Sequence, residues 1–384
     1  MKTPPLALNK IQALVLQPTP LCNIDCRYCY LPDRTVNRVM TSAVLTRVLE
    51  ACFSSSLLAE RVVLLWHAGE PLVVPLAFYH ETLALVERFN TRGVTVIPTL
   101  QTNGMRITQQ WCDFIQQHHI RVGVSLDGPQ HIHDHSRVDR AGKGTFIRAM
   151  RGIELLQQNG VEPSIIMVLT KYALDYPDEI WQFFRDHHLT KLAFNIEEVN
   201  GAHTRSTLEH EQGIQDKYKQ FLRRILELRD HCEQPPFVRE IDTFLDRIYH
   251  LSEAVCSQEN RAGAIVSVDA AGNISTFVSE LLTMTHPRYG DFLLGNIVDG
   301  TLEDMLTGPK LWAINREIQR GVMRCQQTCA YFDFCGGGSP ANKLSEHGTF
   351  DVTETLYCQL KIQATMDVML EHVERRDPGF GTQL

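Results

Sequence analysis

The first half of the chain alternates short apolar runs with longer segments in which apolar residues recur every three or four positions. Short runs rich in β-branched residues predict strands, and the three-to-four-residue period predicts amphipathic helices. The predicted strands are residues 11–17, 62–66, 94–101, 120–126, 164–169 and 191–196. The helices predicted between them are residues 42–53, 76–91, 108–118, 145–158 and 177–187. Regular alternation of strand and helix predicts an α/β fold with parallel strands.

The number of strands limits the kind of barrel that they can form. Six strands are enough for an open, partial (β/α)6 barrel, which we expect over residues 8–199, but too few for the closed eight-stranded barrel. Residues 200–255 are more polar and are expected to form a helical bridge around a long helix at 212–231. Residues 256–384 are expected to form a second, smaller domain. Its predicted elements are a hairpin at 264–274 and a closing helix at 359–375.

The composition narrows the classes of partner. The 384 residues carry a formal net charge of -8 and show no basic stripe, so we do not expect nucleic acid as a partner. No stretch approaches the ~20 apolar residues of a membrane span, and the first ten residues lack the apolar core of a secretory signal. We therefore expect a cytoplasmic protein with no membrane partner.

The eleven cysteines are clustered rather than spread along the sequence. Cytosolic thiols stay reduced, so clustered cysteines in such a chain indicate metal or redox chemistry rather than disulfides. Three lie within residues 22–29 and three more within residues 325–335, whereas Cys52, Cys112 and Cys232 stand alone. The isolated cysteines are expected to be buried as small apolar side chains.

The first cluster, Cys22, Cys26 and Cys29, has the spacing C-x3-C-x2-C on a loop that directly follows the first predicted strand. Three cysteines so spaced can hold three irons of a [4Fe–4S] cluster and leave the fourth iron open for chemistry. A structural zinc site is the alternative, but zinc usually takes four ligands, and no fourth cysteine or histidine follows closely. Sites in parallel β/α folds form where strands end, which favours a catalytic centre.

This spacing resembles the signature of the radical SAM superfamily. The resemblance implies that the open iron binds S-adenosylmethionine, that reductive cleavage gives a 5'-deoxyadenosyl radical, and that a donor such as flavodoxin or ferredoxin supplies the electron. Tyr28 matches the aromatic position that lies against the adenine. Residues 66–71, Trp-His-Ala-Gly-Glu-Pro, resemble the G-G-E-P turn that binds the ammonium group, with Gly69 and Glu70 matching and Ala68 replacing the first glycine. A methyl group is the smallest addition, so we expect this replacement to be mild.

Two further strand ends carry short polar side chains. Asn103 follows the third predicted strand, and Ser125 and Asp127 follow the fourth, each suited to hydrogen-bonding a ribose or a carboxylate. Either segment alone is equally consistent with turn chemistry. Residues 11–198 resemble sulfatase-maturase-like radical SAM enzymes, which implies that Ser125 and Arg137 hold the carboxylate and ribose of S-adenosylmethionine. A guanidinium group suits this role because it can clamp a carboxylate through two hydrogen bonds.

Three alternating histidines, His131, His133 and His135, precede Arg137. Alternate residues of an extended segment share one side, which raises the alternative of a second metal site. No carboxylate or cysteine partner is evident in the sequence, so we expect solvated loop histidines.

The second cysteine cluster, Cys325, Cys329 and Cys335, is followed by Cys358. Four thiolates can fill every iron of a cubane, so this cluster would carry electrons or brace the fold rather than bind substrate. The set resembles the SPASM domain of radical SAM peptide-modifying enzymes, which normally holds two auxiliary clusters.

Most ligands of the nearer auxiliary cluster are missing from this chain. Cys256 matches one of them, but Arg261, Phe277 and Ser339 stand at or near the other positions. One thiolate cannot hold a cubane, so we expect a single auxiliary [4Fe–4S] cluster, held by the four more distal cysteines.

Residues 335–343, 353–358 and 16–20 resemble the cyclophane-forming radical SAM/SPASM peptide maturases. This resemblance implies a ribosomally synthesised precursor peptide as the substrate. It also implies an intramolecular carbon–carbon crosslink between an aromatic ring and a side-chain Cβ. Val278 stands where formylglycine-forming maturases have an aspartate general base, and valine cannot accept a proton. Glu280 is the candidate base that could substitute.

Other functions remain open at this point. Thioether bonding and formylglycine formation are alternative peptide oxidations, and a zinc-stabilised interaction protein is the non-enzymatic alternative. Only about ten residues precede the first predicted strand, so no domain that recognises a peptide leader is expected there.

Overall fold

A ten-stranded sheet forms the framework of the protein. The computed structural model describes residues 8–209, 211–250 and 255–377. Its strand order is β12-β9-β8-β1-β2-β3-β4-β5-β6-β7, and neighbours from β1 to β7 pair in parallel. These strands are β1 (Ile11–Leu16), β2 (Leu58–Trp66), β3 (Thr95–Thr102), β4 (Arg121–Ser125), β5 (Ser164–Leu169), β6 (Lys191–Ile196) and β7 (Phe237–Val238). The six predicted strands and the partial parallel barrel are confirmed, although β2 begins four residues earlier than predicted.

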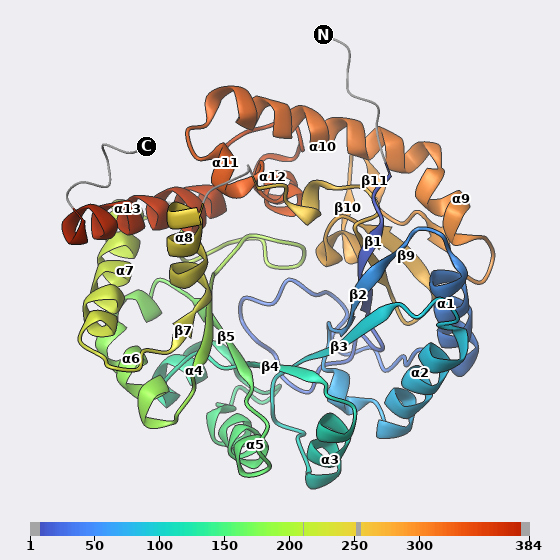
Figure 1. Cartoon of the computed structure of the whole chain (residues 1–384), viewed down its shortest axis with the longest axis horizontal. Helices are drawn as coiled ribbons and strands as arrows, with labels where there is room; N and C mark the ends of the chain where they lie inside the picture. Colours follow the sequence, from blue (N-terminus) through green and yellow to red (C-terminus); the bar gives the residue numbers. More distant parts are fainter. Residues whose placement is uncertain (1–7, 210, 251–254, 378–384) are drawn as a thin grey trace.

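Helices cover the outside of the curved sheet (Figure 1). The predicted helices are present as α1 (Ser42–Ser54), α2 (Leu76–Phe89), α3 (Gln109–Gln117), α5 (Phe146–Gln158) and α6 (Pro177–Asp186). Their starts agree with helix chemistry, since the Thr41 and Thr108 hydroxyls accept backbone N–H groups of α1 and α3. In α5 the residues Met150, Ile153 and Leu156 are buried, as the helical period predicts.

The predicted hairpin continues the barrel sheet. It consists of β8 (Ile265–Val268) and β9 (Asn273–Thr276), and the Asp269 carboxylate accepts two backbone N–H groups in its turn. β8 pairs in parallel with β1, and β12 (Gly295–Asn296) pairs with β9. The C-terminal residues therefore share hydrogen bonds with the first strand. A separate ribbon is formed by β10 (Thr285–His286) and β11 (Gly290–Asp291).

The side of the barrel between β1 and β7 is covered by the C-terminal helices (Figure 1). The predicted bridge helix is α7 (Ile214–Asp230), and the predicted closing helix comprises the π-helical η5 (Cys358–Ala364) and α13 (Thr365–Arg376). The other helices are α4 (Gln130–Ser136), α8 (Arg239–His250), α9 (Leu302–Thr307), α10 (Pro309–Thr328), α11 (Phe332–Cys335) and α12 (Pro340–His347). Short 3-10 turns are η1 (Pro71–Val73), η2 (Ala173–Asp175), η3 (Gln258–Asn260) and η4 (Ser279–Thr283).

The segment with the three histidines is helical, and the prediction of an extended loop was wrong. It forms α4, in which the Arg137 N–H donates to the carbonyl oxygen of His133. Helical geometry places residues four apart on one face, so His131 and His135 both contact Tyr172, whereas His133 points inward and is buried. The His133 ring accepts the Asp127 N–H, and burial lowers its pKa well below the usual value. The histidines therefore do not share one side.

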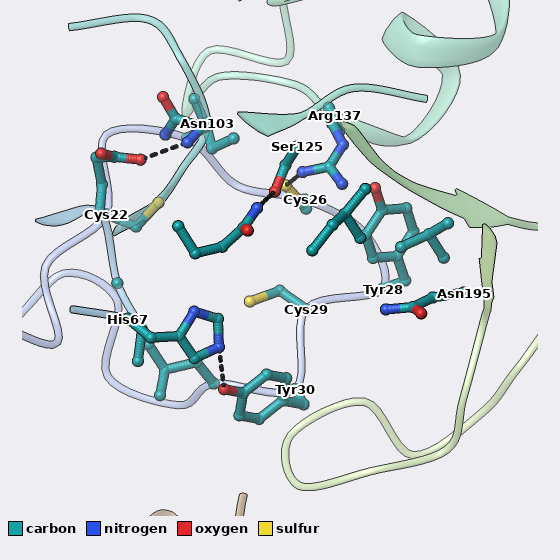
Figure 2. A pocket seen from close by; sticks show the side chains of 18 of the residues that line it. Cys22, Cys26, Tyr28, Cys29, Tyr30, His67, Asn103, Ser125, Arg137 and Asn195 are labelled. Atoms are coloured by element: carbon teal, nitrogen blue, oxygen red, sulfur yellow. Dashed lines mark hydrogen bonds between the residues drawn. The ribbon is translucent and has the colours of Figure 1, made fainter. Parts of the chain in front are cut away.

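The carboxyl ends of the parallel strands surround one cavity, and the loop after β1 brings its cysteines to the cavity wall (Figure 2). This arrangement follows from the parallel pairing, because every strand from β1 to β6 ends at the same edge of the sheet.

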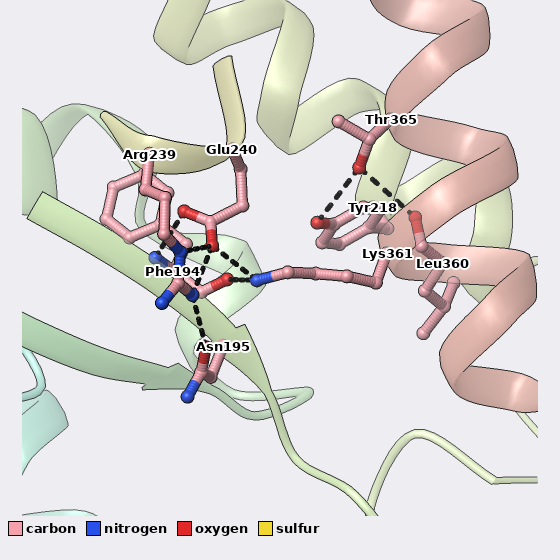
Figure 3. Close-up of polar contacts among 8 residues, drawn as sticks. All are labelled: Phe194, Asn195, Tyr218, Arg239, Glu240, Leu360, Lys361 and Thr365. Carbon is pink, nitrogen blue, oxygen red and sulfur yellow. Dashed lines mark hydrogen bonds and ion pairs between the residues drawn. The ribbon is translucent and has the colours of Figure 1, made fainter. Parts of the chain in front are cut away.

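A buried ion pair attaches the closing helix to the last long strand of the barrel (Figure 3). The Lys361 ammonium of η5 donates to the Glu240 carboxylate and to the carbonyl oxygen of Phe194 in β6. Glu240 also accepts the Phe194 N–H at 2.6 Å. Burial lowers the pKa of Lys361, and the Glu240 carboxylate partly opposes this effect. One carboxylate thus links β6, α8 and η5.

Within the described residues, no helix combines the length and the apolar character that crossing a membrane would require.

We predict that Lys361→Met lowers the free energy of unfolding by about 1.5–3 kcal/mol, because the buried Glu240 carboxylate loses one of its two cationic partners and keeps only the Arg239 guanidinium. Anaerobic urea unfolding followed by circular dichroism measures this effect. The matched control is Lys191→Met, which removes an exposed ion pair with Glu162 and should cost less than about 1 kcal/mol. Equal unfolding midpoints for the two variants would contradict the assigned role of the buried pair.

Candidate functional site

The cavity at the strand ends contains about 290 Å³ of space. Its wall combines the first cysteine cluster with polar side chains from the ends of β2, β3, β4 and β6 (Figure 2). Of the residues predicted for the site, the following line it: Cys22, Cys26, Tyr28, Cys29, Gly69, Glu70, Asn103, Ser125, Arg137 and Glu280. Asp127 is buried behind this wall. The structure therefore brings the N-terminal motifs together, although they span more than a hundred residues.

The cysteine loop is held in place by backbone hydrogen bonds to the segment after α4. The Asp25 N–H donates to the carbonyl of Val138 at 2.7 Å, and the Arg27 N–H donates to the carbonyl of Ser136 at 3.0 Å. The Arg140 guanidinium donates to the carbonyl oxygen of Cys22 at 2.7 Å. These contacts fix the loop between β1 and β4 without using the cysteine side chains.

The three cysteines fit a cluster with one open iron. Burial raises the pKa of the Cys22 and Cys26 thiols to about 12, and each of these thiols is also affected by the charge of Cys29, so the sulfurs lie near one another. The Arg137 guanidinium lies 3.9 Å from the Cys26 sulfur and favours its thiolate form. Three neighbouring thiols on one loop of the cavity wall can hold three irons of a [4Fe–4S] cluster.

The turn after β2 explains why Gly69 is required. Its φ is +58°, and a Cβ there would lie 2.5 Å from the carbonyl oxygen of Thr19 and 2.7 Å from that of Leu21. Ala68 also has a positive φ, of 68°. The expectation that its methyl would be mild because it is small was incomplete, since the cost is in the backbone and amounts to roughly 1 kcal/mol.

The Glu70 carboxylate accepts several hydrogen bonds in the cavity wall. It is buried and accepts hydrogen bonds from the Leu72 N–H at 2.9 Å, the Thr102 hydroxyl at 2.6 Å and the Asn103 N–H at 2.8 Å. Burial raises its pKa, and these donors oppose the shift. The carboxylate therefore joins the end of β2 to the end of β3. Asn103 in turn donates to the side chain of Asn23 in the cysteine loop at 2.7 Å.

Tyr28, Asp127 and Arg137 form a buried network on the same side of the cavity. The Arg137 Nε lies 3.0 Å from the Asp127 carboxylate, and the guanidinium stacks 5.3 Å from the centre of the Tyr28 ring. The Tyr28 hydroxyl donates to the same carboxylate. Asp127 therefore orients these two side chains and does not itself line the cavity. Ser125, also at the end of β4, accepts a hydrogen bond from Gln101 at 2.9 Å.

Several residues of the cavity wall were not predicted from the sequence. Tyr30 and His67 pack together, with Oη and Nε2 3.3 Å apart (Figure 2). Glu198 follows β6 and also lines the cavity, where its carboxylate accepts a hydrogen bond from Asn342 of α12 at 2.9 Å. Its position directly after a strand was the signal that could have identified it.

Besides Glu70, the carboxyl groups of Glu198 and Glu280 in the cavity wall also have raised pKa values. Burial raises the pKa of Glu198 to about 7 and also raises the pKa of Glu280, which lies on η4. The pKa of Tyr30 is raised first by burial and then by the charges of Glu280 and Cys29, so Tyr30 lies near both groups. The cavity therefore places the Glu198 carboxyl, whose pKa is about 7, in the same space as the cysteine ligands.

The four distal cysteines also meet in space, although they come from three helices. Cys325 and Cys329 lie at the end of α10, Cys335 ends α11 and Cys358 begins η5. The pKa of Cys358 is raised to about 12 by burial and by the charges of the other three thiols. Cys335 accepts the Gly337 N–H at 3.3 Å, a contact that suits a metal-bound sulfur.

A buried cation supports a charged state of this second site. Lys343 is 2% exposed, and its ammonium lies 3.5 Å from the Cys325 sulfur. A buried ammonium beside a neutral thiol would be poorly compensated, whereas a metal-bound thiolate provides the opposite charge. The residues at this site therefore fit an iron–sulfur cluster.

Most positions that would supply ligands to a nearer auxiliary cluster carry residues other than cysteine. Cys256 is exposed, and the Arg261 guanidinium donates to the Asn9 side chain at 2.9 Å. Phe277 is buried with a positive φ of 76°, a strained conformation for a bulky residue. These side chains cannot supply the missing thiolates.

Comparisons with known proteins agree with this geometry. Residues 16–186 match the family model described as the Radical SAM superfamily. The uncharacterized protein sll1766 of Synechocystis sp. is 42% identical over 365 residues, which cover 94% of this chain and 92% of that protein. A serine-type anaerobic sulfatase-maturating enzyme of Bacteroides thetaiotaomicron is 27% identical over 352 residues, covering 85% of this chain and 81% of the enzyme.

Solved structures share the fold along nearly the whole chain. The structure titled native anSMEcpe with bound AdoMet has a TM-score of 0.77 at 22% identity and covers 95% of this chain and 99% of that one. Streptococcus suis SuiB bound to precursor peptide SuiA has a TM-score of 0.64 at 16% identity, covering 92% of this chain and 77% of that one. The chain therefore belongs to the radical SAM superfamily, and it is an oxidoreductase that uses a [4Fe–4S] cluster and S-adenosylmethionine.

Proposed function

We propose that this enzyme modifies a ribosomally synthesised precursor peptide by forming an intramolecular crosslink between an aromatic ring and a side-chain Cβ. The observation that carries the proposal is the shared cavity. The cysteine loop and the carboxyl groups of Glu198 and Glu280 all line it. Relatives along most of the chain are named sulfatase-maturating enzymes, and a structural neighbour is bound to a precursor peptide. A peptide substrate is consistent with both.

The residues around the first cluster would bind different parts of the cofactors. Cys22, Cys26 and Cys29 would hold the cluster, and Gly69 leaves its backbone open to the ammonium group of S-adenosylmethionine. Arg137 is positioned by Asp127 to receive a carboxylate or ribose, while Tyr28 offers an aromatic face. When bound, the first cluster with S-adenosylmethionine supplies a hydrogen-abstracting radical, and the auxiliary cluster supplies an electron acceptor.

The substrate changes balance as follows. One Cβ–H bond breaks and its hydrogen atom leaves, after which the carbon forms a bond to the aromatic ring. The ring then loses a proton and an electron to become aromatic again, so the peptide loses two hydrogens in total. Glu280 or Glu198 would accept the proton, since both line the cavity and have raised pKa values.

Formylglycine formation is the second candidate, because the sulfatase-maturating relatives match over most of this chain. Val278, which stands at the position of their expected aspartate base, is buried and cannot accept a proton. This residue favours crosslinking over formylglycine formation.

Anaerobic co-expression with a candidate precursor peptide, a short open reading frame sought beside the gene of this protein, tests the substrate class. We expect the peptide to lose two hydrogens per crosslink, to give no fragment ions between the joined residues and to be unreactive toward an aldehyde reagent. An aldehyde-reactive product would instead establish formylglycine formation. Consumption of a cysteine thiol would indicate a thioether, and an unmodified peptide despite active cleavage of S-adenosylmethionine would contradict this substrate.

We predict that Cys26→Ala abolishes formation of 5'-deoxyadenosine, because two remaining cysteines cannot retain the open cluster. Anaerobic assays with S-adenosylmethionine and a strong reductant, such as dithionite or reduced flavodoxin, measure this product by chromatography. Cys232→Ala, which removes a thiol outside both clusters, is the control and should retain cleavage. Retained cleavage in Cys26→Ala would contradict the assigned ligand.

We predict that replacing the general base slows crosslinking about 10²-fold while cleavage of S-adenosylmethionine continues. Glu280→Gln and Glu198→Gln are compared with the wild type by counting crosslinks per 5'-deoxyadenosine. A base must be ionised, so wild-type crosslinking should rise between about pH 6 and pH 8 if Glu198 serves, since its pKa is about 7. The Glu198→Gln variant should lose this dependence. If both variants crosslink at the wild-type rate, neither carboxyl is the base.

A further inference from the structure

Lys343 is a buried cation for which the radical chemistry of the cavity has no use. It lies on α12 and forms no ion pair with a carboxylate among the described residues. Its ammonium donates to the Cys325 sulfur at 3.5 Å. Removing an ammonium from water costs several kcal/mol unless an opposite charge faces it. The Cys325 sulfur can provide such a charge when it is a metal-bound thiolate.

The neighbouring backbone is shaped to admit this side chain. A Cβ on Gly321 of α10 would lie 2.1 Å from the carbonyl oxygen of Phe350 and 3.2 Å from the Lys343 ammonium. A Cβ on Gly338 would lie 3.7 Å from the Cε of Lys343. Gly321 therefore leaves room for the Lys343 ammonium beside α10, whereas a Cβ at Gly338 would meet the lysine stem only at an ordinary contact distance. The contact with Cys325 is built by close packing rather than by a flexible surface chain.

The helix that carries Lys343 also contacts the cavity. Asn342, the preceding residue, donates to the Glu198 carboxylate at 2.9 Å. Ser345 of the same helix lies 3.3 Å from the side chain of Asn200, another residue of the cavity wall. One short helix thus holds both a carboxyl of the cavity and the sulfur of a candidate cluster ligand.

We propose that Lys343 raises the reduction potential of the auxiliary cluster through its contact with Cys325, and so makes this cluster an electron acceptor for the oxidised substrate. Reduction adds one negative charge to the cluster, and a fixed positive charge beside a ligand sulfur stabilises the reduced form. This inference rests on the auxiliary cluster of the proposed function and not on the identity of the peptide. Lys343 acts through Cys325 and is a positioning residue rather than a catalytic one.

The test isolates the auxiliary cluster in the full-length chain by replacing Cys22, Cys26 and Cys29 with alanine. Anaerobic reconstitution should give about four irons per chain, and a redox titration monitored by electron paramagnetic resonance measures the midpoint potential. Lys343→Met and Lys343→Gln should lower the midpoint potential of the cluster. At a fixed applied potential the ratio of reduced to oxidised cluster should fall at least tenfold, which corresponds to a shift of about 59 mV for one electron. Lys343→Arg keeps the charge and should change the ratio much less. Lys310→Met, which removes an exposed lysine paired with Asp291, should change nothing.

The outcomes separate this inference from the proposed function. An unchanged potential in Lys343→Met with full iron content would overturn the role of Lys343 and leave the auxiliary cluster intact. A different result would be loss of iron in Lys343→Met and Lys343→Gln, while Lys343→Arg keeps its iron and an unchanged electron paramagnetic resonance spectrum. Lys343 would then only stabilise the site, and its proposed effect on the potential would be overturned. Absence of iron from the parent chain would overturn the auxiliary cluster, and the inference with it.

Discussion

The parallel pairing of the barrel strands is the constraint on which the rest of the structure depends. It brings the carboxyl ends of β1 to β6 to one edge, where loops separated by long stretches of sequence meet around a single cavity. The cysteine loop after β1 gains its position from this edge and from backbone hydrogen bonds to the segment after α4. Because the fold holds this loop through its backbone, the cysteine side chains remain available to bind the cluster.

Buried charges lock this edge together. Glu70 joins the ends of β2 and β3, and Asp127 holds Arg137 against the cavity. The pair of Glu240 and Lys361 attaches the C-terminal helix to β6. Asp127 and Glu240 are paired with cations, whereas Glu70 is held by neutral donors, and such buried contacts specify a unique arrangement more than they add net stability. The cost of removing a single partner is correspondingly high. Lys343 follows the same logic, with a cysteine in place of a carboxylate.

Much of the fold could be predicted because its signals are local. Apolar periodicity located the six parallel strands and their helices, and cysteine spacing identified the first cluster without any knowledge of pairing. The sequence could not show that β8 pairs with β1, because this contact joins residues about 250 positions apart, such as Ala13 and Ile265. It also could not show that α4 is helical, since alternating histidines carry no clear period. Glu198 was missed because a carboxylate near a strand end is common, and its role depends on Asn342 of a distant helix.

The central claim is that an open iron–sulfur corner at the strand ends binds S-adenosylmethionine, while a second cluster is fully ligated by protein. Electron paramagnetic resonance of the anaerobically reconstituted, reduced protein tests it most directly when spectra with and without S-adenosylmethionine are compared. We expect about eight irons per chain and two cluster signals, of which one changes on adding S-adenosylmethionine. Two cluster signals that both stay unchanged on adding S-adenosylmethionine would contradict an open iron–sulfur site. So would a protein that binds zinc in place of iron.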